Sequence, residues 1–130
     1  MSDSTNVALV RRVYESGMAA EVTAETMAPD LVWDISPGFP YGGVYHGWDS
    51  VARDFFGQLG PKFDRFAAKP EQYFAADGNH VVVEGHYHAV PKGGPEVAIR
   101  FSHLWTIRDG KLSEMVQTAD SHVLQRALAA

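Results

Sequence analysis

The sequence predicts an α+β domain in which helices pack on one face of a curved antiparallel sheet. Apolar residues with helical spacing lie before residue 60, whereas the region 63–120 shows the alternation that is typical of strands. Asp109-Gly110 separates two alternating segments and is a strong signal for a tight hairpin. The chain has 130 residues and no internal repeat or linker, so residues 1–130 are expected to form one domain, with 1–5 flexible.

Two long helices and one short helix are predicted ahead of the sheet. Thr5 or Asn6 can cap the first, which has an apolar face of about three turns. That face consists of Val7, Val10, Val13, Tyr14 and Met18. A short helix is expected over 23–27. Asp49 is expected to cap the second long helix, which ends at Gly60-Pro61 and carries an apolar stripe of Val51, Phe55, Phe56 and Leu59.

The other regular segments are predicted to be strands, followed by one closing helix. The strands are expected over 31–35, 63–69, 72–76, 80–90, 97–108 and 111–119, and the helix over 121–129. Residues 36–46 contain two prolines and three glycines and are expected to form a loop. The aromatic residues of this loop either cover a pocket or pack onto the core.

Composition excludes several classes of function. The chain has no cysteine, so disulfides, thiol nucleophiles and cysteine zinc sites are excluded. A net charge of −5, with Arg11-Arg12 as its only adjacent basic pair, argues against nucleic-acid binding. No secretory signal and no apolar run long enough for a membrane span are visible, so we expect a cytoplasmic protein without membrane contact.

Three segments resemble the SnoaL-like branch of the nuclear-transport-factor-2-like superfamily. They are Met-Ala-Pro-Asp-Leu-Val-Trp (27–33), Tyr-His-Gly (45–47) and the hairpin segment 101–112, which Gln117 and Asp120 follow. The resemblance implies a cystatin-like, cone-shaped sheet that wraps around the N-terminal helices and opens to a small-molecule pocket. It also implies a homodimer through the convex sheet face. Members include ketosteroid isomerases, polyketide cyclases, limonene-epoxide hydrolases, dehydratases and non-catalytic binders, so the fold alone does not identify the activity.

The resemblance suggests His103, Tyr14 and Asp34 as catalytic residues. Ketosteroid isomerisation needs an aspartate base and two oxyanion donors. Tyr14 lies near the place of the family tyrosine and His103 near that of its protonated acid, but the place of the base falls on Ile35 or Ser36. Asp34 reaches the pocket only if a bulge rotates it inward. His103 is the best candidate for the base or donor of a cyclase, and the alternative is a core histidine without chemistry.

The expected ligand-binding residues are mainly aromatic or apolar, although core packing is their default role. They are Trp33, Phe55, Phe101, Trp105, Met115, Gln117 and His88. Gln117 occupies the place of an acid in epoxide hydrolases and argues against that mechanism. His86 and His88 share a strand face with Glu84, and a metal cluster with His103 needs this face inside. Alignment with the family segments favours that orientation, whereas apolarity places Val81, Val83, Tyr87 and Ala89 inside. Asp120 is expected to cap the last helix rather than to act as an acid.

These observations predict a homodimeric pocket protein for a small apolar or cyclic carbonyl compound, without cofactor or metal. Proton-transfer catalysis with His103, aided by Tyr14 and Gln117, is one possibility. A non-catalytic ligand binder and a scaffold with a vestigial cavity are the alternatives.

Overall fold

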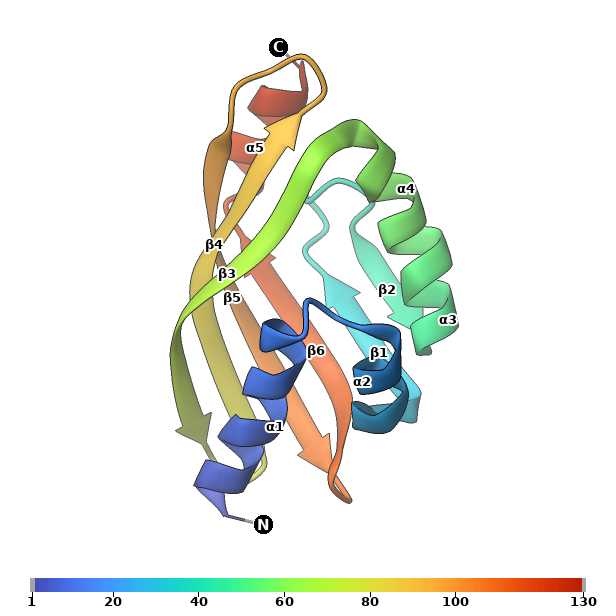
Figure 1. Ribbon diagram of the computed structural model, residues 1–130, viewed down its shortest axis with the longest axis vertical. Helices are drawn as coiled ribbons and strands as arrows, with labels where there is room; N and C mark the ends of the chain where they lie inside the picture. Colours follow the sequence, from blue (N-terminus) through green and yellow to red (C-terminus); the bar gives the residue numbers. More distant parts are fainter. Residues whose placement is uncertain (1, 130) are drawn as a thin grey trace.

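A computed structural model describes residues 2–129 and shows a six-stranded curved sheet that wraps around N-terminal helices (Figure 1). The predicted α+β fold class is confirmed. The strand order is β2-β1-β6-β5-β4-β3, and every neighbouring pair is antiparallel except β1 and β6, which are parallel. The strands are β1 (Met27–Ile35), β2 (Gly43–His46), β3 (Phe63–Ala76), β4 (His80–Pro91), β5 (Val97–Arg108) and β6 (Lys111–Ala119).

The meander from β3 to β6 forms the larger part of the sheet. Strands β5 and β6 and the closing helix α5 (Ser121–Ala129) have the predicted bounds, and Asp120 caps α5 by accepting a hydrogen bond from the Val123 amide at 3.3 Å. The prediction of two short strands around Pro70 is wrong, because β3 is one strand whose register shifts between Pro70 and Gln72. A strand can keep its pairing past a proline where such a bulge absorbs the missing donor.

The first two helices begin earlier than the sequence predicts. Helix α1 (Asp3–Glu15) is capped by Ser2, whose hydroxyl oxygen accepts from the Thr5 amide at 3.1 Å. Asn6 is therefore inside the helix, where its side-chain amide donates to the Gly78 carbonyl at 2.8 Å. Helix α2 (Ala20–Thr26) follows. Of the five residues expected to be flexible, Met1 lies outside the described residues and Asp3 to Thr5 form the first turn of α1.

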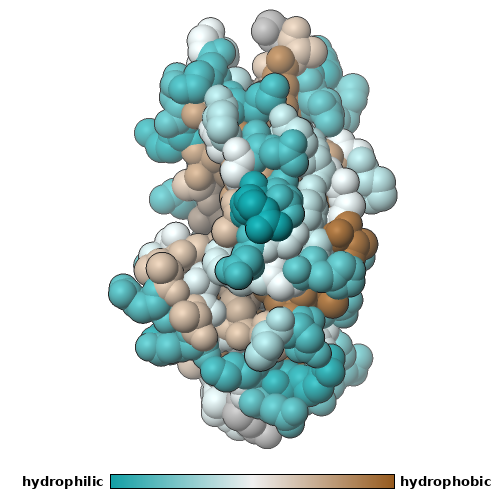
Figure 2. Space-filling model, turned by 90° about the vertical axis from the view of Figure 1, so that its right-hand side faces the viewer, coloured by the Kyte–Doolittle hydropathy of each residue, from teal (hydrophilic) through white to brown (hydrophobic). Residues whose placement is uncertain are grey.

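Between β1 and β3 the chain forms an edge strand and a continuous helical rod beside it (Figure 1). The expectation of a loop up to residue 46 is wrong at its end, because Gly43–His46 pair with β1. The rod consists of α3 (Trp48–Ser50), the π-helical segment η1 (Val51–Phe56), α4 (Gly57–Leu59) and the 3₁₀ turn η2 (Gly60–Lys62). Asp49 is not its cap, because Gly47 precedes the first turn. Figure 2 faces this side of the molecule, which is mainly hydrophilic with a few separate hydrophobic residues.

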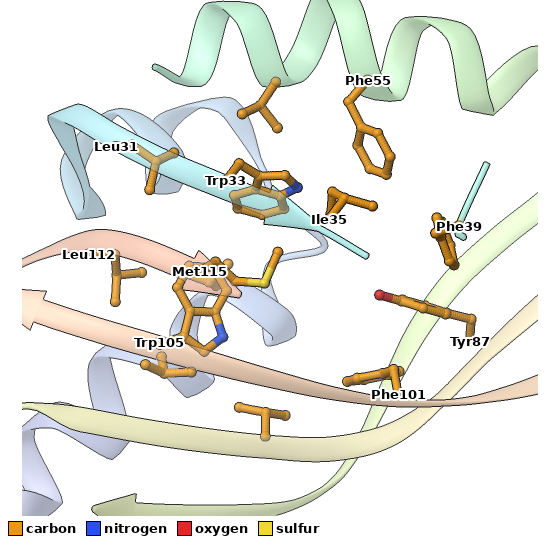
Figure 3. Close-up of a cluster of buried hydrophobic side chains, with 14 of the residues drawn as sticks. Leu31, Trp33, Ile35, Phe39, Phe55, Tyr87, Phe101, Trp105, Leu112 and Met115 are labelled. Atoms are coloured by element: carbon orange, nitrogen blue, oxygen red, sulfur yellow. The ribbon is translucent and has the colours of Figure 1, made fainter. Parts of the chain in front are cut away.

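The core lies between the inner face of the sheet and the helices, and it is rich in aromatic side chains (Figure 3). The Trp33 and Trp105 rings meet edge to face, with centroids 5.6 Å apart, and Tyr87 stacks on Phe101 at 4.6 Å. Aromatic pairs of this kind stabilise a core beyond their buried area. Among residues 2–129, no helix has the length and apolarity needed to cross a membrane.

Candidate functional site

A cavity of about 670 Å³ opens between the inner sheet face, the end of α1 and the helical rod. Its volume lies within the range of small-molecule sites. The lining residues are Tyr14, Glu15, Gly17, Met18, Trp33, Ile35, Phe39, Trp48, Ala52, Phe55, Phe56, Leu59, Phe66, Ala67, Ala68, Lys69, Tyr87, His103, Met115 and Gln117. The only charged members, Glu15 and Lys69, are solvent-exposed. The rest of the wall is therefore uncharged and mostly apolar.

His103 lies in this wall with both ring nitrogens hydrogen-bonded to tyrosines. Its Nδ1 is 2.5 Å from the Tyr14 hydroxyl, and its Nε2 is 2.6 Å from the Tyr87 hydroxyl. Strand alternation explains the arrangement, because residues 101, 103 and 105 of β5 share the inner face and Tyr87 lies on the inner face of β4. Tyr14 comes from helix α1, which packs against β3 and β4.

Two further side chains extend this chain of hydrogen bonds. Trp105 donates its indole N–H to the Tyr14 hydroxyl oxygen at 2.9 Å, and Gln117 donates its amide to the Tyr87 hydroxyl oxygen at 2.8 Å. We call these five residues the tyrosine–histidine network: Trp105, Tyr14, His103, Tyr87 and Gln117. The network joins one helix to three neighbouring strands, so its geometry depends on the whole fold.

The Gln117 end of the network is fixed by the segment that follows β1. The side-chain carbonyl of Gln117 accepts from the Ser36 amide at 3.3 Å, and the Ser36 hydroxyl donates to the Gln117 backbone carbonyl at 2.7 Å. The Gln117 carbonyl oxygen is thereby occupied, so its amide nitrogen is oriented toward Tyr87.

Burial keeps every member of the network uncharged at neutral pH. Desolvation lowers the pKa of His103 to about 3. It also raises the pKa of both tyrosine hydroxyls, an effect that the hydrogen bonds from Trp105 and Gln117 oppose. His103 is therefore a neutral imidazole with one N–H, and both tyrosines keep their protons.

This geometry argues against His103 as a general base. A base acts best when its pKa lies near the operating pH, and it must reach the substrate proton. His103 meets neither condition, because its pKa is about 3 and tyrosine hydroxyls occupy both nitrogens. The hydroxyls of Tyr14 and Tyr87 belong to residues that line the cavity and can act as hydrogen-bond donors.

Two predicted site residues lie away from the cavity. Asp34 is half-buried on the other face of β1, and the unbroken pairing from Val32 to Ile35 leaves no bulge that would turn it inward. His88 points outward, with Nδ1 3.8 Å from the Glu96 carboxylate. The assignments of Asp34 to catalysis and of His88 to ligand binding are therefore corrected; for His88, the apolar alternation of β4 decides the orientation.

Of the remaining predicted residues, some line the cavity and others pack behind the lining residues. Trp33, Phe55, Met115 and Gln117 line the cavity with Tyr14 and His103. Phe101 and Trp105 point inward but lie behind the wall, since Phe101 stacks on the His103 ring at 4.2 Å and Trp105 bonds to Tyr14. They shape the network rather than touch the cavity.

Sequence reasoning missed the role of Tyr87. The alternation of β4 places it inside with Val81, Val83 and Ala89, and a hydroxyl on an otherwise apolar face was the available signal. The same alternation sends His86 to the outer face, where its Nδ1 is 2.9 Å from the Glu71 carboxylate. No group of three or more histidine or acidic side chains within residues 2–129 is placed to hold a metal ion.

A cone-shaped sheet that closes over an apolar cavity defines an NTF2-like, cystatin-like protein. Within this class, the chain belongs to the family of SnoaL-like domains, whose model matches residues 8–115. The predicted resemblance is confirmed. No curated protein matches the chain.

Solved structures with this fold cover nearly the whole chain. An NTF2-like protein from Burkholderia thailandensis is 25% identical, with a TM-score of 0.85 and 98% of each chain covered. A putative SnoaL-like polyketide cyclase from a Jannaschia species is 25% identical, with a TM-score of 0.80, and the match covers 98% of this chain and 93% of that one. TerC, co-crystallised with polyporic acid, is 22% identical, with a TM-score of 0.86, and the match covers 97% and 99%.

Proposed function

We propose that this protein binds a small cyclic, mostly apolar carbonyl compound in the cavity. The observation that carries the proposal is the uncharged wall with tyrosine hydroxyls as its hydrogen-bond donors. A carbonyl oxygen accepts such a bond without bringing a charge into the core, where an unpaired charge would be costly. Trp33, Phe55 and Met115 supply apolar surface for a flat ring. The complex of the structural neighbour TerC with polyporic acid shows that the fold can be crystallised with a small organic compound.

Binding is favoured over proton abstraction by the protein. The only carboxylate among the lining residues is that of the solvent-exposed Glu15, and both ring nitrogens of His103 are hydrogen-bonded to tyrosines. A second candidate is catalysis in which a hydroxyl of Tyr14 or Tyr87 stabilises the oxyanion of an enolising substrate. Preorganised neutral donors in a dry site stabilise such an oxyanion strongly.

Calorimetric titration with 1-tetralone, a bicyclic aromatic ketone, tests the proposal. Ala68 lines the cavity from β3 and pairs with the inward Tyr87, so Ala68→Phe should fill space and abolish binding. Ala75 is exposed on the same strand and outside the lining, so Ala75→Phe is the matched control and should bind like the wild type. Absence of binding to the folded wild type, or unchanged binding by Ala68→Phe, would contradict the proposal.

We also propose that the protein is a homodimer through the outer face of the sheet. An apolar row crosses all six strands on this face, interrupted once by Asp34, and the pairing places each member beside the next. The row consists of Phe74, Val82, Leu104, Val116 and Val44. Phe74, Val44 and Leu104 are 45%, 54% and 39% exposed, and an exposed apolar row of this kind is typical of an interface.

Sedimentation equilibrium tests the dimer. Leu104→Lys places a charge at the centre of the row and should convert the dimer to a monomer. Gln58→Lys, on the exposed side of α4, is the control and should leave the dimer intact. A monomeric wild type, or a Leu104→Lys dimer of wild-type affinity, would contradict this assignment.

A further inference from the structure

The protons of the tyrosine–histidine network do not all have acceptors within it. Neutral His103 donates one hydrogen bond and accepts one, and its two partners are the hydroxyls of Tyr14 and Tyr87. Each tyrosine oxygen already accepts a bond from its other neighbour, Trp105 or Gln117. The tyrosine that receives the imidazole N–H therefore accepts two bonds, and its own proton has no acceptor in the network.

The tautomer of His103 decides which hydroxyl keeps this unused proton. With the proton on Nδ1, His103 donates to Tyr14, Tyr87 donates to Nε2, and the Tyr14 proton is unused. With the proton on Nε2, the roles exchange and the Tyr87 proton is unused. Both tyrosines line the cavity, so either tautomer offers one hydroxyl donor to a bound molecule.

Trp33 supplies a second donor without a partner. Its side chain is 2% exposed and lines the cavity, and its indole N–H has no hydrogen-bond partner within residues 2–129. In Figure 3 the Trp33 nitrogen lies on the Ile35 side of its ring, and the Tyr87 hydroxyl points toward the same interior space. A buried donor without an acceptor is rare in folded proteins and requires an explanation. An acceptor atom on a ligand provides one.

Both spare groups are donors, and the side-chain oxygen of Gln117 is already occupied by Ser36. We propose that the cavity selects ligands with two hydrogen-bond acceptors, one bound by the tyrosine hydroxyl that the His103 tautomer frees and one by the Trp33 indole N–H. The expected class is cyclic dicarbonyl or quinone-type compounds. This inference rests on the proposed function, because it assigns the polar contacts of the same ligand.

Three bicyclic probes of similar shape separate the polar contacts from occupancy of the cavity. Tetralin has no acceptor, 1-tetralone has one, and 1,4-naphthoquinone has two. We expect affinity to rise in this order, by about 2-fold to 10-fold for each acceptor, which corresponds to one hydrogen bond. Trp33→Phe keeps an aromatic ring and removes the N–H, so it should reduce the advantage of the quinone over tetralin by one such step, whatever the smaller ring does to the affinity for tetralin itself.

The tyrosines provide a signature that loss of packing would not produce. Tyr14→Phe leaves the Tyr87 hydroxyl free, and Tyr87→Phe leaves the Tyr14 hydroxyl free, since His103 can adopt either tautomer. Each single variant should therefore retain most of the preference for 1,4-naphthoquinone over tetralin, and only the double variant should lose one hydrogen-bond step. Thermal denaturation of each variant confirms that it is folded.

Imidazole ¹⁵N shifts of His103 in the wild type provide a test without any substitution. We expect one protonated and one bare nitrogen at neutral pH, and a change in tautomer population when 1,4-naphthoquinone binds. A doubly protonated ring, or equal affinity for 1-tetralone and 1,4-naphthoquinone, would overturn the two-acceptor inference while leaving the cavity proposal intact. Failure of every probe to bind the folded protein would overturn both.

Discussion

His103 should make the protein sensitive to acid, because its pKa is about 3 in the folded state and 6.5 when the side chain is exposed. Above about pH 6.5 the imidazole is neutral in both states and contributes no pH dependence. As the pH falls below this value, the unfolded chain binds a proton that the folded chain excludes. The free energy of unfolding should then fall by up to about 1.4 kcal/mol per pH unit, until the pH reaches the folded pKa.

Integration over the accessible range gives a loss of about 3 kcal/mol between about pH 7.5 and about pH 4.5. This is a large part of the stability of a typical domain. Urea unfolding measured at several pH values, with midpoints and slopes fitted separately, provides the assay. His103→Gln keeps a neutral donor and acceptor but does not titrate, so its stability at neutral pH should be lower and this component of its pH dependence should be absent.

The matched control is His86→Gln on the outer face, where the histidine is partly exposed beside Glu71. This variant keeps His103, so its free energy of unfolding should fall in acid as that of the wild type does. If His103→Gln loses stability in acid as steeply as the wild type, the claim that His103 is a buried neutral imidazole is wrong.

Two further substitutions test the packing that supports the site. Trp105→Phe removes the donor to Tyr14 and leaves unfilled volume, so we expect a loss of about 1–3 kcal/mol of unfolding free energy by urea titration. Gly85→Ala would place a Cβ 2.2 Å from the Lys69 carbonyl oxygen at the bulge of β3, so the melting temperature should fall by several degrees, about 4–8 °C per kcal/mol. Gly60→Ala, whose Cβ would meet nothing within 4 Å, should not lower it; equal melting temperatures for the two alanine variants would refute the steric argument.

Local patterns in the sequence determined most of the fold. The alternation along 97–108 and 111–119 gave the bounds of β5 and β6, because an alternating strand with one buried face permits a single register. The same alternation correctly placed His103 and Trp105 inside and Tyr87 on the apolar face of β4. Local patterns were less informative at the ends of helices and in short edge strands. There, a single capping residue or a few strand pairings determine where the element begins and ends. The Ser2 cap and strand β2 were missed for this reason.

The site itself was decided by tertiary structure. Alternation states which face a side chain occupies, but it does not state which atoms meet across the core. That both ring nitrogens of His103 bond to tyrosine hydroxyls from α1 and β4 follows only when residues far apart in the chain come within hydrogen-bond distance. The outward orientation of Asp34 likewise depends on unbroken pairing with β2, a strand that the sequence did not reveal. Side-chain type and periodicity are local properties of the chain, whereas a pKa and a hydrogen-bond partner are set by the surroundings that folding creates.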